Sequence, residues 1–236
     1  MSQSAAENLF ALWDTYEKVV AGNYMFHREI AEEITRALSA RFDGTAFSIL
    51  DLGCGDAATF APLLKGLAVA RYKGVDLSQA ALALAGKKLS VLRGSVELVH
   101  ADILSALSEA GSFDVIYTSF ALHHLSTDEK AEAFRRAARR LAANGLLLLV
   151  DVVREEDETL PVYYRRYCDW LRRDWTGLDP REREAVCDHI VANDLPEPYS
   201  VLETQADAAG LTRAPGGARH GWHRLMRFTR AGSQKQ

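Results

Sequence analysis

The chain has 236 residues, of which 48% are hydrophobic and 25% charged, a composition typical of a soluble globular protein with one sizeable core. Its formal net charge of −4 provides no overall basic excess to replace phosphate counterions, so nucleic acid is disfavoured as a partner. The three cysteines are scattered and form no CxxC pair, which argues against a disulfide framework and a zinc site. We also find no basic-then-apolar signal and no apolar run that could span a bilayer, and therefore expect a cytoplasmic protein without a membrane segment.

The first part of the chain is predicted to be helical. Apolar residues recur at three- to four-residue spacing through residues 5–41, from Leu9 and Leu12 to Leu38, and Gly22-Asn23 separates two segments. From residue 46, short apolar runs alternate with helical stretches, which is typical of buried parallel strands in a doubly wound α/β sheet. The predicted strands are 47–52, 70–75, 96–99, 113–118 and 146–153, and the predicted helices lie near 57–66, 78–92 and 127–142.

The later elements carry clear helix and turn signals. Ser126-Thr-Asp-Glu129 predicts a capping box, and Asn144-Gly145 predicts the end of the same helix. After residue 153 we expect two helices within 154–198, the second beginning at Asp179-Pro180, then a helix capped by Ser200 and ending at Gly210, and a hairpin of strands near 212–214 and 222–229 joined by Gly216-Gly217.

A glycine turn, Asp51-Leu-Gly53-Cys-Gly55, lies where the first predicted strand meets a helix. Glycines at such a turn let the backbone approach a ligand, and ligands bind at the carboxyl ends of parallel strands. The glycine pattern alone is a weak signal. Asp76 ends the second strand and Asp102 follows the third, so three carboxylates are predicted at one edge of the sheet. Any one of them could instead cap a helix, but together they favour a ligand site.

Four segments resemble motifs of the class I S-adenosylmethionine-dependent methyltransferases. ILDLGCGDA resembles the glycine motif, GVDLS the ribose-binding acidic motif, HADIL the adenine-binding motif, and FDVIYTSFALHHL the segment after the fourth strand. The resemblance covers residues 46–153, and the last helix and hairpin are similar to the family's closing reversed strand. It implies a mostly parallel, seven-stranded, Rossmann-like sheet with S-adenosylmethionine across its switch point, in an enzyme that methylates oxygen, nitrogen or carbon.

The resemblance also implies which residues hold the cofactor. Gly53 and Gly55 would line its amino-acid moiety, Asp51 would orient the ammonium, and Asp76 would bind the ribose. Asp102 would lie near the adenine, with Ile103 packed on the ring. The implied cofactor-binding set is Asp51, Gly53, Cys54, Gly55, Asp76, Leu77, Ala101, Asp102, Ile103 and Ser119. A loop ending in Asp51 and flanked by Asp56 would repel a pyrophosphate more than an ammonium, which favours S-adenosylmethionine over NAD.

Candidate catalytic residues lie near the expected position of the methyl group. His123 and His124 follow the fourth strand and could touch the acceptor or the cofactor carboxylate, or be packed histidines. Tyr16 and His27 are further candidates from the first helices. Adjacent residues on a helix point in different directions, so we expect the two histidines not to chelate one metal ion. Alignment can carry much of the rate of methyl transfer, and a general base helps only a protonated acceptor.

We expect a single domain over residues 1–236, with an N-terminal helical cap (1–45), a cofactor-binding core (46–153), a helical lid (154–198), and a closing helix and hairpin (199–236). The cap, lid and hairpin carry aromatic and arginine side chains that would suit a small acidic or aromatic acceptor. Such side chains more often pack in a core or face solvent. They are Tyr16, Tyr24, His27, Tyr163, Tyr164, Arg165, Arg166, Tyr167, Trp170, Arg172, Arg173, Arg219, His220, Trp222 and His223.

Two alternatives keep the same cofactor fold. The arginine-rich insertion would also suit an enzyme that modifies a tRNA or RNA nucleoside with S-adenosylmethionine or a derivative of it. A non-catalytic cofactor-binding interaction module is the other alternative, although a degenerate site usually loses its acids. A monomer and a homodimer are both compatible with the sequence.

Overall fold

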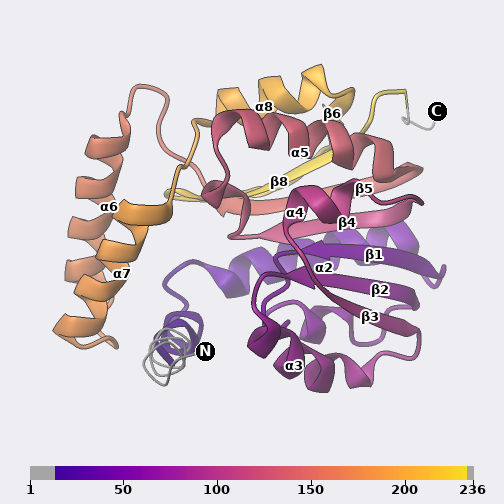
Figure 1. The fold of residues 1–236 in the computed structure, drawn as a ribbon, viewed down its shortest axis with the longest axis horizontal. Helices are drawn as coiled ribbons and strands as arrows, with labels where there is room; N and C mark the ends of the chain where they lie inside the picture. The colour runs from indigo at the N-terminus through magenta and orange to yellow at the C-terminus, as the bar shows by residue number, and fades with distance from the viewer. Residues whose placement is uncertain (1–13, 233–236) are drawn as a thin grey trace.

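The computed structural model describes residues 14–232, in which eight strands form one sheet with helices on both faces (Figure 1). The strands are β1 (Phe47–Leu52), β2 (Val69–Asp76), β3 (Ser95–His100), β4 (Phe113–Ser119), β5 (Leu141–Val152), β6 (Leu211–Arg213), β7 (Ala218–His220) and β8 (His223–Arg230). Their order is β3-β2-β1-β4-β5-β8-β6, with β7 paired to β8. The first five strands are parallel, and β8 runs antiparallel to β5. The predicted doubly wound, mostly parallel α/β fold is confirmed.

The helices follow the predicted alternation with the strands. They are α2 (His27–Phe42), α3 (Gln79–Lys88), α4 (Ile103–Leu107), α5 (Thr127–Arg140), α6 (Leu160–Asp174), α7 (Pro180–Asn193) and α8 (Tyr199–Ala208), with short 3-10 helices η1 (Ala61–Leu64), η2 (Leu89–Val91) and η3 (Leu122–His124). Residues 14–21 are also helical. The predicted break at Gly22-Asn23 is therefore confirmed, whereas Leu9 and Leu12 lie outside the described residues.

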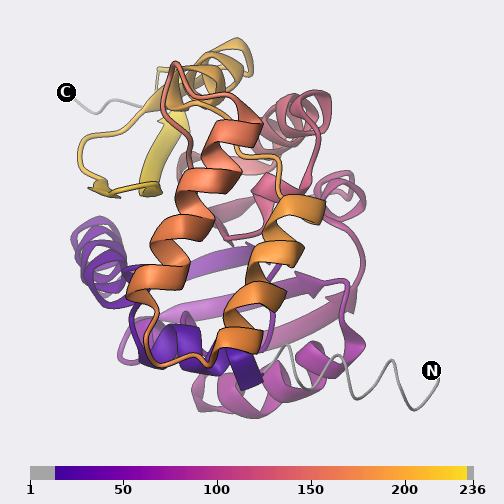
Figure 2. The same ribbon diagram turned by 90° about the vertical axis from the view of Figure 1, so that its left-hand side faces the viewer.

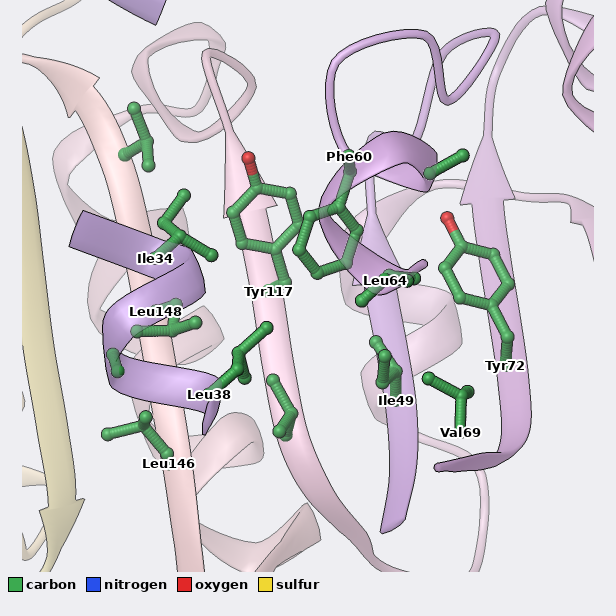
Figure 3. Close-up of a cluster of buried hydrophobic side chains, with 14 of the residues drawn as sticks. Ile34, Leu38, Ile49, Phe60, Leu64, Val69, Tyr72, Tyr117, Leu146 and Leu148 are labelled. Atoms are coloured by element: carbon green, nitrogen blue, oxygen red, sulfur yellow. The ribbon is translucent and has the colours of Figure 1, made fainter. Parts of the chain in front are cut away.

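The core has two halves because successive side chains of each strand point to opposite faces of the sheet. On one face, Leu146 and Leu148 of β5 pack with Ile34 and Leu38 of α2, as Figure 3 shows. On the other face, Leu147 packs among residues of α4, α5 and α8. Burial on both faces explains the nearly continuous apolar run of this strand in the sequence. The sheet is thereby held rigid, with its carboxyl edge exposed to the loops that follow each strand.

Helices α6 and α7, here called the insertion helices, lie side by side at one end of the sheet (Figures 1 and 2). They have their own apolar core, which includes Tyr167, Leu171 and Trp175. The predicted start of α7 is confirmed, because Asp179 and Glu182 form a reciprocal capping box with Pro180 in the first turn. The insertion is thus a helical hairpin that packs on itself as well as on the sheet.

Two predicted helix boundaries are wrong. The segment near 57–66 contains only the short η1, because Ala57 has a positive φ of 57° and Pro62 lies at the start of that helix. Helix α5 ends at Arg140 and not at Asn144-Gly145, because Leu141 is already extended and pairs with Phe113 of β4. In both places the pairing or the turn geometry of neighbouring segments outweighs local helix propensity.

The carboxyl-terminal region also differs from prediction in detail. Ser200 does not cap α8, since Pro198 is the N-cap residue and the Ser200 hydroxyl donates to Glu156 instead. Three residues of the expected loop form the additional strand β7, so the described sheet has eight strands where seven were predicted. Strand β7 is short and pairs only at the edge, a feature with little sequence signal. Within residues 14–232, no helix is both long and apolar enough to cross a membrane.

Candidate cofactor and acceptor site

A cavity of about 450 Å³ lies at the carboxyl edge of the sheet, beyond the ends of β1, β2 and β4. It is lined by every residue that we expected to hold the cofactor, and by two of the catalytic candidates, Tyr16 and His124. The lining residues are Tyr16, Asp51, Gly53, Cys54, Gly55, Asp56, Thr59, Phe60, Val75, Asp76, Leu77, Ala101, Asp102, Ile103, Tyr117, Ser119, Phe120, Ala121, His124 and Leu125. The cavity has the size of an ordinary small-ligand site.

The turn after β1 needs glycine for two reasons. Gly53 has a φ of +72°, and a Cβ atom there would approach the Cβ atom of Ala121 to 2.5 Å. The backbone N–H groups of Gly53 and Cys54 both donate to the carbonyl of Val75, at 2.8 and 3.0 Å. This pairing ties the turn to the end of β2 and opens its backbone toward the cavity.

Substitution of Gly53 by alanine should therefore lower the free energy of unfolding by more than the strain of a left-handed backbone alone would. Gly44 is a matched control, since it has the same φ of +72° but nothing within 4 Å of its Cβ position. We expect Gly44→Ala to lower the free energy of unfolding by about 1–2 kcal/mol. Gly53→Ala should add about 1–3 kcal/mol for the steric contact. Urea unfolding of both variants measures the difference, and equal losses would contradict the close packing at Gly53.

Asp51 is a buried carboxylate at the end of β1, only 2% exposed. Burial raises the pKa of Asp51 to about 7, and the negative charge of Asp76 adds to this rise. The hydroxyl of Tyr72 donates a hydrogen bond to the Asp51 carboxylate and opposes the rise. Because burial destabilises the ionised form of this carboxylate, a cationic group bound in the cavity would stabilise it. This arrangement is typical of a binding residue and not of a surface acid.

Asp76 and Asp102 lie on the same edge and both organise local backbone. The Asp76 carboxylate accepts from the backbone N–H of Gly55 at 2.8 Å and of Ser78 at 2.7 Å, so it joins the glycine turn to the end of β2. Asp102 is the N-cap residue of α4 and accepts from the Ser105 hydroxyl and backbone N–H, which lower its pKa. The helix-cap alternative is thus true of Asp102, and both acids still line the cavity.

The rest of the cavity is mainly apolar and aromatic. His27 lies behind this wall, with its ring edge-on to Tyr16 and to Phe120, at centroid distances of 6.3 and 5.5 Å. Both ring nitrogens are buried without a hydrogen-bond partner among residues 14–232. Burial lowers the pKa of His27 to about 4, opposed by the charge of Glu29, so the imidazole is neutral near pH 7.

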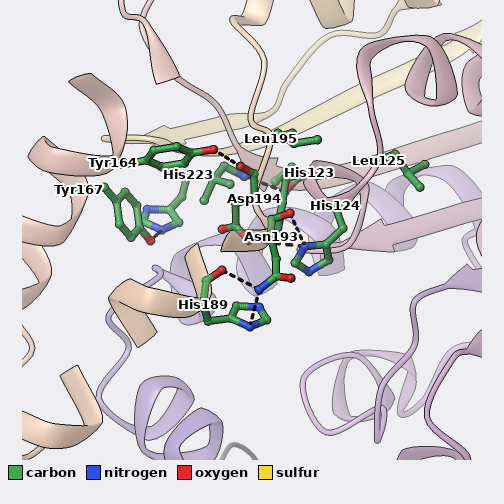
Figure 4. Close-up of polar contacts among 12 residues, drawn as sticks. His123, His124, Leu125, Tyr164, Tyr167, His189, Asn193, Asp194, Leu195 and His223 are labelled. Carbon is green, nitrogen blue, oxygen red and sulfur yellow. Dashed lines mark hydrogen bonds and ion pairs between the residues drawn. The ribbon is translucent and has the colours of Figure 1, made fainter. Parts of the chain in front are cut away.

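His123 is buried away from the cavity lining, in contact with two acids that the sequence reasoning did not connect with it. Its Nδ1 donates to Asp151. Its Nε2 lies 3.6 Å from Oδ1 of Asp194, which Figure 4 shows beside it. Burial disfavours the charged imidazole, but Asp151 and Asp194 outweigh burial and raise the pKa of His123. A charge inside the apolar run 146–153 was the available signal for Asp151. Asp194 lies too far along the chain to be paired with His123 by inspection.

Most aromatic residues of the insertion and hairpin do not reach the cavity. Tyr163, Tyr167 and Trp170 pack in or against the core of the insertion helices, and His223 is fully buried with its Nε2 on the Tyr167 hydroxyl at 2.9 Å. The aromatic residues at helical spacing in the insertion therefore pack in a core and do not line the cavity. Phe120, Ala121 and Leu125 line the cavity instead. They lie in the segment after β4 that resembles a family motif, but only the histidines and Ser119 of that segment were expected as site residues.

Comparisons with known proteins agree with this geometry. Residues 49–145 match a family described as a methyltransferase domain. The uncharacterized methyltransferase YrrT of Bacillus subtilis is 30% identical over 148 residues, which cover 62% of this chain and 67% of that protein. Indolepyruvate C-methyltransferase of Streptomyces griseus is 24% identical over 238 residues, covering 86% of this chain and 71% of that protein.

Among solved structures, magnesium protoporphyrin IX methyltransferase of Synechocystis PCC 6803, with bound S-adenosylhomocysteine, is 17% identical with a TM-score of 0.63. The similarity covers 91% of this chain and 86% of that chain, which establishes a shared fold. The first curated relatives are matched over about two thirds of their own length, at 66% and 67%.

Proposed function

Because this chain belongs to the class I S-adenosylmethionine-dependent methyltransferases, we propose that it transfers the methyl group to a small-molecule acceptor. The observation that carries this proposal is a single cavity in which three acids and a glycine turn lie beside an apolar, aromatic wall. The acids suit the polar groups of the cofactor, and the wall suits an apolar or aromatic acceptor. The similarity to indolepyruvate C-methyltransferase supports a small-molecule acceptor.

The residues of the cavity fit the cofactor that the family uses. When bound, S-adenosylmethionine supplies a methyl group already activated by its sulfonium. Asp51 would hold the ammonium, since its buried carboxylate lies at the glycine turn. Asp76 would accept from the ribose hydroxyls, and Asp102 would bind the adenine amino group with Ile103 against the ring. Gly53 would let the backbone come close to the amino-acid part.

The charge of the insertion helices favours a small acceptor over RNA. Three of their six arginines are paired with acids: Arg172 with Glu184, Arg173 with Asp174, and Arg166 with Glu158, each at 2.7 Å. A surface that binds a nucleic-acid backbone needs unpaired cations to release counterions. With half of these cations already paired, the insertion is less suited to hold RNA, which favours a small acceptor.

Catalysis in this site would consist mainly of alignment. The sheet edge fixes the cofactor, and Phe120 and Leu125 would confine the acceptor beside the methyl group, which is enough for an in-line displacement at an activated carbon. His124 lines the cavity and is placed to touch the acceptor. His27 lies behind the wall, and its neutral ring would position Tyr16 and Phe120, against which it packs edge-on.

We expect His27→Ala to lower kcat/KM for the acceptor by about 10- to 100-fold, because loss of the ring removes the packing that holds Tyr16 and Phe120 in the wall beside the acceptor. Affinity for S-adenosylhomocysteine should change less than about twofold, since the ring of His27 packs against this wall. His27→Phe is the control, because it keeps an aromatic ring at this position and should retain kcat/KM within about threefold. Equal kcat/KM in His27→Ala and wild type would contradict the positioning role of His27.

The function itself is tested in two steps. Calorimetry should show binding of S-adenosylhomocysteine and no comparable binding of NAD. Release of S-adenosylhomocysteine is then measured with a panel of aromatic acids, phenols, amines and 2-oxo acids, and in parallel with total RNA at low salt. Turnover with a member of the small-molecule panel supports the proposal, whereas turnover with RNA alone would overturn it.

A further inference from the structure

Three metal-ligating atoms converge where the end of α7 meets η3. Oδ1 of Asp194 lies 3.6 Å from Nε2 of His123 and 3.5 Å from Nδ1 of His124. Ligand atoms of these three residues all lie within 4.8 Å of one another. Figure 4 shows the three residues close together, although they come from segments about seventy residues apart.

The oxygen of Asp194 that faces the two histidines is buried and makes no hydrogen bond within the part of the chain that the structure describes. Asp194 is 6% exposed, and within residues 14–232 its Oδ1 has no hydrogen-bond partner. A buried, unsatisfied carboxylate oxygen is costly unless a cation or a proton lies against it. His124 does not satisfy it with a hydrogen bond, and its Nδ1 makes only a long contact of 3.4 Å with the carbonyl of Asn193.

His123 is oriented as a metal ligand usually is. Its Nδ1 donates to Asp151, whose Oδ1 also accepts from the backbone N–H of Val152 at 2.9 Å. In the neutral tautomer this leaves the Nε2 lone pair directed at Asp194. A carboxylate that fixes the far nitrogen of a ligating histidine is the common outer-shell arrangement at protein metal sites.

The spacing also suits a tetrahedral ion. Zinc bonds to nitrogen and oxygen are about 2.0–2.2 Å, which places neighbouring ligand atoms of a tetrahedron about 3.3–3.6 Å apart. The separations of Asp194 Oδ1 from the nitrogens of His123 and His124, 3.6 and 3.5 Å, match this edge length. They are too long for strong hydrogen bonds, which fall below about 3.2 Å.

The frame around the three residues is tightly held. The backbone N–H of Leu195 donates to the carbonyl of His123 at 2.7 Å, and the Lys130 ammonium donates to the carbonyls of Leu125 and Leu195. Lys130 adds a positive charge nearby, which Glu197 offsets at 3.9 Å. The position of Asp194 against His123 is therefore set by main-chain contacts and not by a mobile side chain.

We propose that His123, His124 and Asp194 form a binding site for a divalent transition-metal ion, of which Zn²⁺ is the probe of choice. Two imidazoles and one carboxylate suit Zn²⁺ or Fe²⁺ and not Mg²⁺ or Ca²⁺, which prefer oxygen ligands. The site departs from our expectation that the adjacent histidines would not share an ion, because Asp194, the residue after α7, lies close to a ring nitrogen of each. His124 also lines the cofactor cavity, so an open coordination position there would face the acceptor.

The test uses the full chain freed of metal by a chelator. Calorimetry with Zn²⁺ should show one ion per chain, and Co²⁺ should produce the visible absorption bands of a low-symmetry site. His124→Ala and Asp194→Asn should each weaken binding by about 100-fold, and Asp151→Asn by about 10- to 100-fold through loss of orientation. His124 has a 42% exposed side chain, so its variant should fold as the wild type does.

The matched control is His189→Ala, which removes a histidine whose ring lies 5.8 Å from that of His124 but which is outside the proposed set. Binding unchanged within about threefold in this variant supports the three-residue assignment. Loss of binding in His189→Ala as severe as in His124→Ala would overturn that assignment. Weak, non-saturating binding to the wild type, or binding that survives both ligand substitutions, would show that His123 holds only a proton and would overturn the site. These readouts do not depend on methyl transfer.

Discussion

Asp76→Ala is expected to weaken binding of S-adenosylhomocysteine by about 100-fold or more, the largest loss from any single change at the cofactor end of the cavity. The substitution removes the carboxylate proposed to accept from two ribose hydroxyls. It also frees the backbone N–H groups of Gly55 and Ser78, which the carboxylate now fixes at 2.8 and 2.7 Å. Calorimetry of the variant and the wild type measures this loss directly.

Asp114→Ala provides the control for general destabilisation. Asp114 also accepts two hydrogen bonds, from the Ser48 backbone N–H at 2.8 Å and from its hydroxyl at 2.7 Å, but near the amino-terminal ends of β1 and β4. We expect this variant to lose stability and to keep its affinity for S-adenosylhomocysteine. If both variants lost affinity equally, the effect of Asp76 would come from unfolding and not from ribose binding.

Affinity for S-adenosylhomocysteine is expected to rise about five- to tenfold between pH 6 and pH 7.5. The pKa of Asp51 is about 7 in the free protein, so much of the population carries a proton on this carboxyl at pH 6. An ammonium binds the ionised carboxylate, and binding below pH 7 must therefore expel that proton. Above pH 8 the gain should cease, because Asp51 is then ionised and the ligand amine begins to lose its own proton.

Asp51→Asn should abolish this slope and lower the affinity at pH 7.5 by about tenfold. The same variant should unfold less easily in the absence of ligand. The folded protein keeps the Asp51 proton between about pH 4 and pH 7, where an unfolded chain has lost it, so this group lowers stability as the pH rises through that range. At pH 8 the whole penalty is present, and a pKa raised from 3.8 to about 7 corresponds to about 4 kcal/mol, so its removal should raise the free energy of unfolding by up to this amount. A variant less stable than wild type at pH 8 would contradict this assignment.

The sequence by itself determined the order of strands and helices in the core and the edge at which a ligand would bind. Short apolar runs such as 146–153, alternating with helical stretches, are typical of buried parallel strands. A glycine turn followed by Asp76 and Asp102 places acids at the ends of consecutive strands. These signals are local: each depends on residues within one strand, turn or helix cap. The ten residues expected to hold the cofactor accordingly line one cavity.

Contacts between distant segments were decided only by the tertiary structure. The sequence does not show whether the tyrosines of 160–174 face a ligand or one another, since a helical stripe reads the same in both cases. It equally does not show that Leu195 bonds to His123, which brings Asp194 beside two adjacent histidines. Burial of His27 and Asp51, and hence their pKa values, also depends on what packs over them. Spacing along the chain specifies the elements, whereas the acceptor wall and the proposed metal site exist only where those elements meet.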